Sequence, residues 1–179
     1  MAAVRDIFDF LDGLAAFDTQ MDFDNAGFLV GRSGRKVTHL LVSLDITEEV
    51  VEEAGALGAE LIVSHHPVIF HPVRSITDQD PVGRTLLAMV EKGISAICAH
   101  TNLDAAVGGV NDALAARLGL TDTVVLEPSG TDREGRPIGI GRAGIVADGV
   151  PTSTAEYASF VKKTLGANGV RYVDAGRPI

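Results

Sequence analysis

The chain has a single cysteine, Cys98, and no tryptophan. One cysteine excludes a disulfide within the chain and fits a reducing compartment, so we expect a cytoplasmic protein. Cys98 ends the apolar run of residues 94–98. This position predicts a small core residue rather than a catalytic thiol.

Long apolar runs and positive charge are also scarce. No run approaches the ~20 apolar residues of a membrane span. The N-terminal segment has an early acid, Asp6, and lacks a long apolar core, so we expect no signal peptide. Lys and Arg number 15 against 24 Asp and Glu, which leaves a net charge of −9. Phosphate neutralisation needs clustered cations, so we expect no general nucleic-acid binding and no membrane partner. An acidic balance suits a protein that holds cations, although many cytoplasmic proteins are simply acidic.

The chain does have enough apolar residues for one sizeable core, at 46% of its 179 residues. Helical spacing or helix-start signals predict helices over 4–14, 47–58, 81–93, 110–118 and 154–165. Apolar and β-branched runs predict strands over 37–44, 61–63, 94–98, 123–126, 138–147 and 170–173. This alternation predicts an α/β fold with a mostly parallel or mixed sheet flanked by helices.

The same alternation suggests how the chain is organised. Residues 1–126 are interpreted as a metal-binding α/β core, and 127–179 as a strand–helix–strand extension of the same domain. Residues 174–179 form a turn signal that leads into an apolar residue. We therefore expect a chain truncated at 179.

The clearest motif is Ser64-His65-His66-Pro67, which directly follows a buried strand. Sites in open α/β sheets form at the carboxyl ends of strands. Neutral imidazole is a common metal ligand, and Pro67 restricts the backbone of His66. Two interpretations stay open: ligands of one or two ions, or two polar loop residues.

A second polar cluster follows the next buried strand. Asp104 is an oxygen donor that would complete a His₂Asp ligand set. Thr101 and Asn102 are suited to hydrogen bonds that orient ligands. His100 is interpreted as an orienting or structural histidine. A helix cap is the alternative for Asp104, although Gly109 fits that role better.

A third polar segment, residues 22–31, contains Asn25. It is either a loop lining the site, with Asn25 touching substrate or ordering the metal loop, or a plain Asx-turn. Other catalytic templates are missing: the sequence has no Gly-x-Ser-x-Gly elbow, no Walker loop and no His-Glu-x-x-His. The sequence names no catalytic residue.

Taken together, these segments resemble the Nif-three-like dinuclear metal family, often labelled GTP cyclohydrolase type 2 homologues. The matching stretches are 24–31, 43–47, 64–72, 99–106 and 108–112, in that order, and they cover most of residues 1–120. The second histidine motif and Thr-Asn-Leu-Asp are the specific ones.

The resemblance implies that His65, His66 and Asp104 are metal ligands. They would hold up to two divalent ions (Zn, Fe, Mn, Ni or Mg) per site in the full-length protein. The family completes its site with a His-x-x-x-Glu motif, which this chain lacks, and no histidine follows His100. Family members form ring-shaped hexamers, so self-association is implied too.

Two functions follow. The first is a metal-dependent hydrolase, which would be GTP cyclohydrolase type 2-like if its site is complete. In it, two ions would activate water and bind a nucleotide or another phosphate-containing small molecule. The second is a non-catalytic metal-binding adaptor or regulatory protein, which the missing ligands favour.

Overall fold

The computed structural model describes residues 1–174 and 176–179. They form two compact units, Met1–Ala106 and Val107–Ile179. The sequence interpretation instead divides one domain after residue 126. The two compact units do not test the predicted division after residue 126, which stays a prediction.

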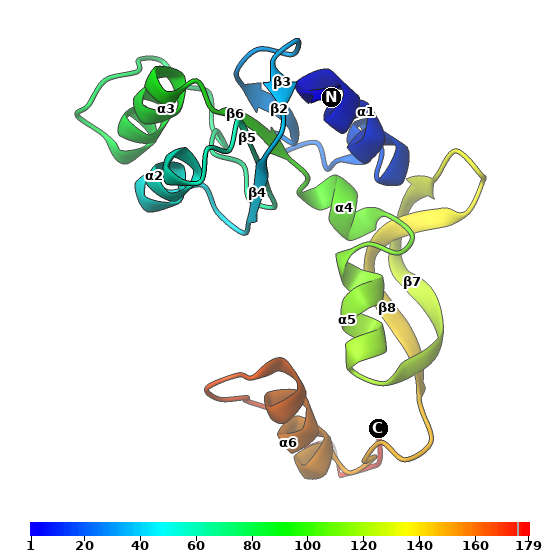
Figure 1. Ribbon diagram of the computed structural model, residues 1–179. Coiled ribbons are helices and arrows are strands. Elements are labelled where there is room, and N and C mark those ends of the chain that lie inside the picture. The colour runs from blue at the N-terminus through cyan, green and yellow to red at the C-terminus, as the bar shows by residue number, and fades with distance from the viewer. Residues whose placement is uncertain (175) are drawn as a thin grey trace. The chain divides into compact units, whose positions relative to one another are not determined.

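A four-stranded mixed sheet organises the first unit (Figure 1). Its strands, in spatial order, are β2 (Gly27–Val30), β6 (Ser95–Cys98), β5 (Leu61–Ser64) and β4 (Leu40–Ser43). β4, β5 and β6 are parallel, and β2 pairs antiparallel with β6 at one edge. The predicted α/β class with a mostly parallel or mixed sheet is confirmed.

Helices cover both faces of this sheet. One face packs against α2 (Glu48–Ala56) and α3 (Pro81–Lys92), and the other against α1 (Val4–Leu14) (Figure 1). Successive side chains of a strand point to opposite faces. Ile62 of β5 accordingly joins the α2 and α3 core, whereas Leu61 joins the α1 core. Covered on both sides, the central strands are continuously apolar rather than alternating.

Local capping chemistry sets the helix boundaries close to those predicted. Thr47 caps α2 by accepting a hydrogen bond from the Val50 amide. Asp80 caps α3, whose first residue is Pro81. Gly93 ends α3 in the left-handed conformation, with φ of 65°.

One predicted strand is divided in two. Residues 37–44 form β3 (Lys36–Val37), which pairs with β1 (Ala2–Ala3), and then β4. Between them the amides of Thr38 and His39 donate to the Glu60 carboxylate rather than to a neighbouring strand. A side chain 22 residues away thus interrupts a run that is β-like in its local pattern.

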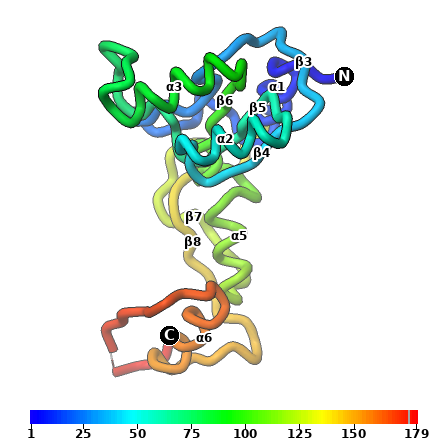
Figure 2. Tube along the Cα trace, turned by 60° about the vertical axis from the view of Figure 1, so that its left-hand side comes forward, coloured from blue at the N-terminus to red at the C-terminus, as the bar shows by residue number. Residues whose placement is uncertain are grey.

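The second unit contains α5, a long hairpin and α6. Its elements are α5 (Val110–Arg117), β7 (Leu120–Thr131), β8 (Pro137–Val146) and α6 (Thr154–Leu165). β7 and β8 are antiparallel, and α5 runs along them (Figure 2). β7 extends beyond the predicted 123–126 at both ends, and it pairs with β8 through Pro128, whose register partner is Gly139. Residues 170–173, predicted as a strand, form none.

Short connecting elements complete the first unit. The 3₁₀ helix η1 (Phe17–Thr19) follows α1, and α4 (Thr101–Ala105) follows β6. The longest helices, α3 and α6, have 12 residues each. Throughout the described residues, no helix has the length and apolar character needed to cross a membrane.

Candidate metal centre

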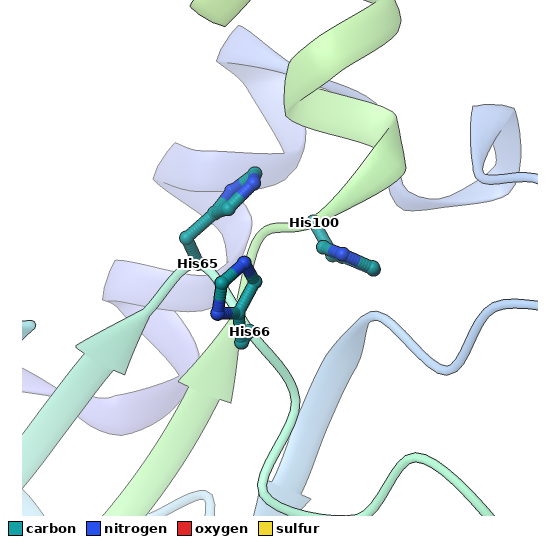
Figure 3. Close-up of side chains that lie close together, drawn as sticks. All are labelled: His65, His66 and His100. Carbon is teal, nitrogen blue, oxygen red and sulfur yellow. The ribbon is translucent and has the colours of Figure 1, made fainter. Parts of the chain in front are cut away.

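Three histidines gather beyond the carboxyl ends of two parallel strands (Figure 3). His65 and His66 follow β5, and His100 follows β6. The last residues of these strands, Ser64 and Cys98, are register partners, so the segments that leave the strands start side by side. The imidazole centroids lie 5.1 Å apart for His65–His66 and for His65–His100, and 5.7 Å apart for His66–His100.

The spacing of the donor atoms suits a metal ion. One ligand atom from each of the three histidines lies within 4.8 Å of the others. Metal–imidazole bonds of about 2.1 Å place two nitrogens on one ion at most about 4.2 Å apart. Three nitrogens around a tetrahedral ion lie about 3.4 Å apart, so the three rings would have to move closer together to share one ion.

Each histidine is oriented through its Nδ1 atom. The oxygen partners are Ala99 O at 2.9 Å for His65, Asp45 Oδ1 at 2.7 Å for His66 and Asp24 Oδ1 at 2.8 Å for His100. A backbone carbonyl or a carboxylate only accepts, so Nδ1 carries the proton and donates it. In the neutral rings the Nε2 atoms keep their lone pairs. This is the arrangement that metal-binding histidines adopt.

Asp104 adds an oxygen next to these nitrogens. It lies in α4, and its Oδ1 atom is 3.7 Å from Nε2 of His65. That distance is too long for a hydrogen bond. A carboxylate oxygen facing an imidazole lone pair is stabilised when a cation lies between them. The donor set is therefore imidazole nitrogen with carboxylate oxygen, which suits zinc, iron and manganese.

Asp24 is a buried carboxylate that holds His100. Its side chain is 0% exposed. It accepts hydrogen bonds from the Asn25 amide at 2.7 Å, and from the amide and hydroxyl of Thr101 at 3.0 and 2.5 Å. Burial raises the pKa of Asp24, but the hydrogen bonds from Thr101 and His100 outweigh it, so the pKa lies below its ordinary value. The group stays ionised and fixes the His100 ring.

The remaining predicted residues contact protein groups. Asn102 is fully buried; its amide nitrogen donates to Ala15 O at 2.7 Å and its oxygen accepts from the His100 amide. Asn25 donates to Ile69 O at 2.6 Å, in the loop that follows the histidine pair. Of the two interpretations of Asn25, this contact fits the one in which it orders that loop.

Sequence reasoning missed the two carboxylates that orient histidines. Asp45 follows β4, the third parallel strand, and so has the same topological position as the histidine pair. That position could have predicted Asp45 as a site residue. The sequence signal for Asp24 was weak, because its partner His100 is 76 residues away.

The centre is open on the His66 side. The side chain of His66 is 44% exposed, against 21% for His65 and 18% for His100. His66 is therefore the most solvent-accessible of the three rings, and His65 and His100 are more enclosed by the protein.

Fold and site together define an α/β protein with a histidine cluster that could hold a metal, set at the carboxyl ends of parallel strands. A sequence model of the family Duf34/NIF3 (NGG1p interacting factor 3) matches residues 2–178. The chain belongs to this family, as its resemblance to the Nif-three-like proteins led us to expect.

Curated relatives agree with this assignment. A "GTP cyclohydrolase 1 type 2 homolog" of Clostridium perfringens is 35% identical over 169 residues, covering 94% of this chain and 63% of the relative. One of Streptomyces coelicolor is 32% identical, covering 99% and 61%. The chain thus spans less than two thirds of the length of these relatives.

Solved structures show the same fold. A Staphylococcus aureus hypothetical protein matches with a TM-score of 0.80 and 27% identity, covering 96% of this chain and 67% of that one. A Bacillus cereus protein related to NIF3 matches with a TM-score of 0.69 and 39% identity, covering 72% and 36%.

Proposed function

We propose that this chain binds divalent metal through His65, His66 and Asp104, with His100 as an adjoining donor. In the full-length protein the centre would serve a metal-dependent hydrolase acting on a nucleotide or another phosphate-containing small molecule. The observation that carries the proposal is the common orientation of the three histidines. Each donates through Nδ1 to an oxygen, which leaves its Nε2 atom for a metal, and one ring nitrogen from each of the three lies within 4.8 Å of the others.

The chain's own residues would prepare the site before any ligand binds. The Ala99 carbonyl fixes the His65 ring, and the ionised Asp24 fixes the His100 ring. When bound, a divalent ion would lower the pKa of a water molecule and polarise a phosphate oxygen. The name of these relatives, GTP cyclohydrolase 1 type 2 homolog, supports a nucleotide as the substrate class.

Metal content tests the binding part of the proposal. We expect His65→Ala and Asp104→Ala to weaken metal binding by at least about tenfold, the loss seen when even a ligand's supporting hydrogen bond is removed. Elemental analysis and a zinc titration of each variant give the measurement. His71→Ala is the matched control, because His71 lies on the same loop but outside the cluster and packs on Phe70. Wild-type metal content in both site variants would contradict the assignment.

A turnover screen tests the catalytic part. Nucleotides and phosphoesters are assayed with added Mn²⁺, Zn²⁺ or Fe²⁺, for the wild type and His65→Ala. Metal-dependent turnover that His65→Ala abolishes supports the hydrolase. Metal binding without turnover of any compound would favour the adaptor or regulatory role instead. The self-association implied by the family resemblance is measured on the same samples by light scattering.

A further inference from the structure

A second pocket lies at the end of β6 remote from the histidines. It has a volume of about 390 Å³ and is bordered by the end of β2, the C-terminus of α3 and the start of β6. We call it the arginine pocket; it is defined by Arg32, Arg35, Ser95, Val30, Met89 and Ile94. Ser95 begins β6 and His100 follows its end, and five residues of extended chain span about 16 Å. The pocket is therefore separate from the metal centre.

The pocket is basic in an acidic protein. The chain carries a net charge of −9, yet residues 25–44 contain no Asp or Glu and include Arg32, Arg35 and Lys36. Two of these three cations line the pocket, and no acidic residue does. Within residues 1–174 and 176–179, neither guanidinium pairs with a carboxylate. Both charges are available to an anion.

A fixed turn presents the two arginines. The Arg35 amide donates to Arg32 O at 3.0 Å, which closes the turn. Its Ser33 and Arg35 carbonyls accept from the amides of Arg5 and Val4, at 2.9 Å each, and so tie the turn to the first residues of α1. The backbone that carries both guanidinium groups is thus held in place before a ligand arrives.

A buried hydroxyl in the pocket wall lacks a partner. Ser95 is 0% exposed, and its Oγ atom makes no hydrogen bond within the described residues. Gly31, at φ of 115°, lies against it, and a Cβ there would come within 2.2 Å of Ser95 Oγ. Buried polar groups are almost always satisfied, so an orphan hydroxyl calls for an explanation. A ligand oxygen beside Gly31 would supply the missing acceptor once a small shift of that glycine uncovers the hydroxyl.

Apolar side chains form the rest of the wall. Val30 is half-buried and Val90 is 67% exposed, whereas Met89 and Ile94 are buried. Pockets of about 300–1,000 Å³ with mostly apolar walls and a few convergent polar groups are typical of small-molecule sites. The pocket therefore suits a molecule with an apolar body and an anionic end.

We infer that the arginine pocket binds a phosphate monoester that carries an apolar or aromatic group. Two guanidinium groups match a dianion better than a monoanion, and their planar donors suit phosphate oxygens. The hydroxyl of Ser95 donates to the same anion. The apolar body packs on Val30 and Val90. This site is independent of the metal proposed at the histidines.

Arg35 also has a structural alternative. Its guanidinium lies over Gly93, where an added Cβ would be 2.5 Å from Nη1, and the C-terminus of α3 attracts cations. No hydrogen bond joins Arg35 to an α3 carbonyl within the described part of the chain. If Arg35 served the helix alone, Arg35→Gln would lower the melting temperature and leave anion binding unchanged.

Calorimetric titration of the full chain with phenyl phosphate tests the inference. We expect a dissociation constant at or below about 1 mM, within reach of a ligand of this size. Arg32→Gln and Arg35→Gln should each weaken binding about tenfold, as loss of charge-assisted hydrogen bonds predicts. Ser95→Ala should weaken it about threefold without lowering the melting temperature, because an unsatisfied hydroxyl is removed.

Lys36→Gln is the matched control, because it removes the same charge from the same segment but lies outside the pocket. It should bind within about twofold of the wild type. Equal loss in Lys36→Gln and Arg32→Gln would mean general attraction to a basic segment and would overturn the site. Absence of phenyl phosphate binding at about 10 mM, roughly ten times the expected dissociation constant, would also overturn the site.

Two further measurements distinguish binding in this pocket from binding at the metal centre, and identify the kind of anion that binds. His65→Ala should bind phenyl phosphate as the wild type does, whether or not metal binds at the histidines. Binding lost in His65→Ala but kept in the Arg32→Gln/Arg35→Gln double variant would assign the phosphate to the metal centre and overturn the inference. Benzoate and inorganic phosphate should both bind more weakly than phenyl phosphate; equal binding of benzoate would contradict the choice of a dianion.

Discussion

Glu60 joins the chain before β4 to the residue before β5. Its carboxylate accepts from the amides of His39 and Thr38, at 3.0 Å each, and from the Thr38 hydroxyl at 2.9 Å. These hydrogen bonds lower the pKa of Glu60 to about 2, from an ordinary value of 4.5. The hydrogen bond from the His39 amide has the largest effect. The charged form is therefore favoured in the folded protein.

This shift predicts a pH dependence of stability. Because the folded pKa is lowered, the contribution of Glu60 is complete above about pH 4.5 and is lost as the pH falls toward 2. Glu60→Gln should therefore lower the free energy of unfolding at pH 6, and its difference from the wild type should shrink steadily below pH 4.5. Urea unfolding between pH 6 and pH 3 measures it.

Glu91→Gln is the control, because it removes a carboxylate from an exposed position on α3. A difference between wild type and Glu60→Gln that stays constant over this pH range would contradict the role given to the carboxylate.

Cys98 shows how burial decides chemistry at a single residue. It is fully buried at the end of β6, and its thiol donates to His65 O at 2.8 Å. Burial, chiefly, raises the pKa of Cys98 to about 12. A thiol with that pKa stays protonated at neutral pH and is a poor nucleophile. Its position in an apolar run already predicted this core role.

At the scale of the element, capping signals predicted the helices well. The start of α3 combines Asp80 as cap with Pro81 as first residue, and Asp80 Oδ1 accepts from the Gly83 amide at 2.9 Å. Gly83 has no room for a side chain, since a Cβ would lie 2.1 Å from the Thr77 carbonyl oxygen. The loop before α3 is therefore closed over the first turn of the helix.

Removal of this cap gives a prediction for the element. Asp80→Ala should lower the free energy of unfolding by about 1 kcal/mol, because one amide of the first turn loses its partner. Asp80→Asn, whose side-chain oxygen can still accept, should recover most of that loss. Chemical denaturation of the three proteins measures it, and equal loss in Asp80→Ala and Asp80→Asn would show that the side-chain oxygen does not act as the cap.

Strand boundaries were harder to predict than helix boundaries. Helix ends carry local signals, whereas a strand begins and ends where a partner does. The run 37–44 is interrupted by Glu60, and β7 continues through Pro128 because β8 pairs with it there. Glu60 lies 22 residues from Thr38 and Gly139 lies 11 residues from Pro128, so the pattern within each run could not reveal its boundary.

At the scale of the whole molecule, all residues of the proposed metal centre belong to the first of two compact units. Metal at 100 times its dissociation constant stabilises a folded unit by about 2.7 kcal/mol. Hydrogen exchange with and without Zn²⁺ should therefore slow in β5 and β6, by up to about 100-fold for amides that exchange by unfolding of the unit. α6, in the second unit, should be unaffected. Equal slowing in both units, or none, would contradict metal binding at the strand ends.

The sequence by itself determined that polar, metal-ligating residue types follow short buried strands. The sequence alone predicts His65 and His66 after one strand and Asp104 after the next. It can do so because apolar runs and the residues that end them are local features. Only the tertiary structure decided which side chains orient the histidines. Asp24 reaches His100 across 76 residues, and Asp45 reaches His66 across 21. The arginine pocket likewise exists only where a turn, a helix end and a strand start meet. Such contacts depend on how distant segments pack, and no local periodicity encodes them.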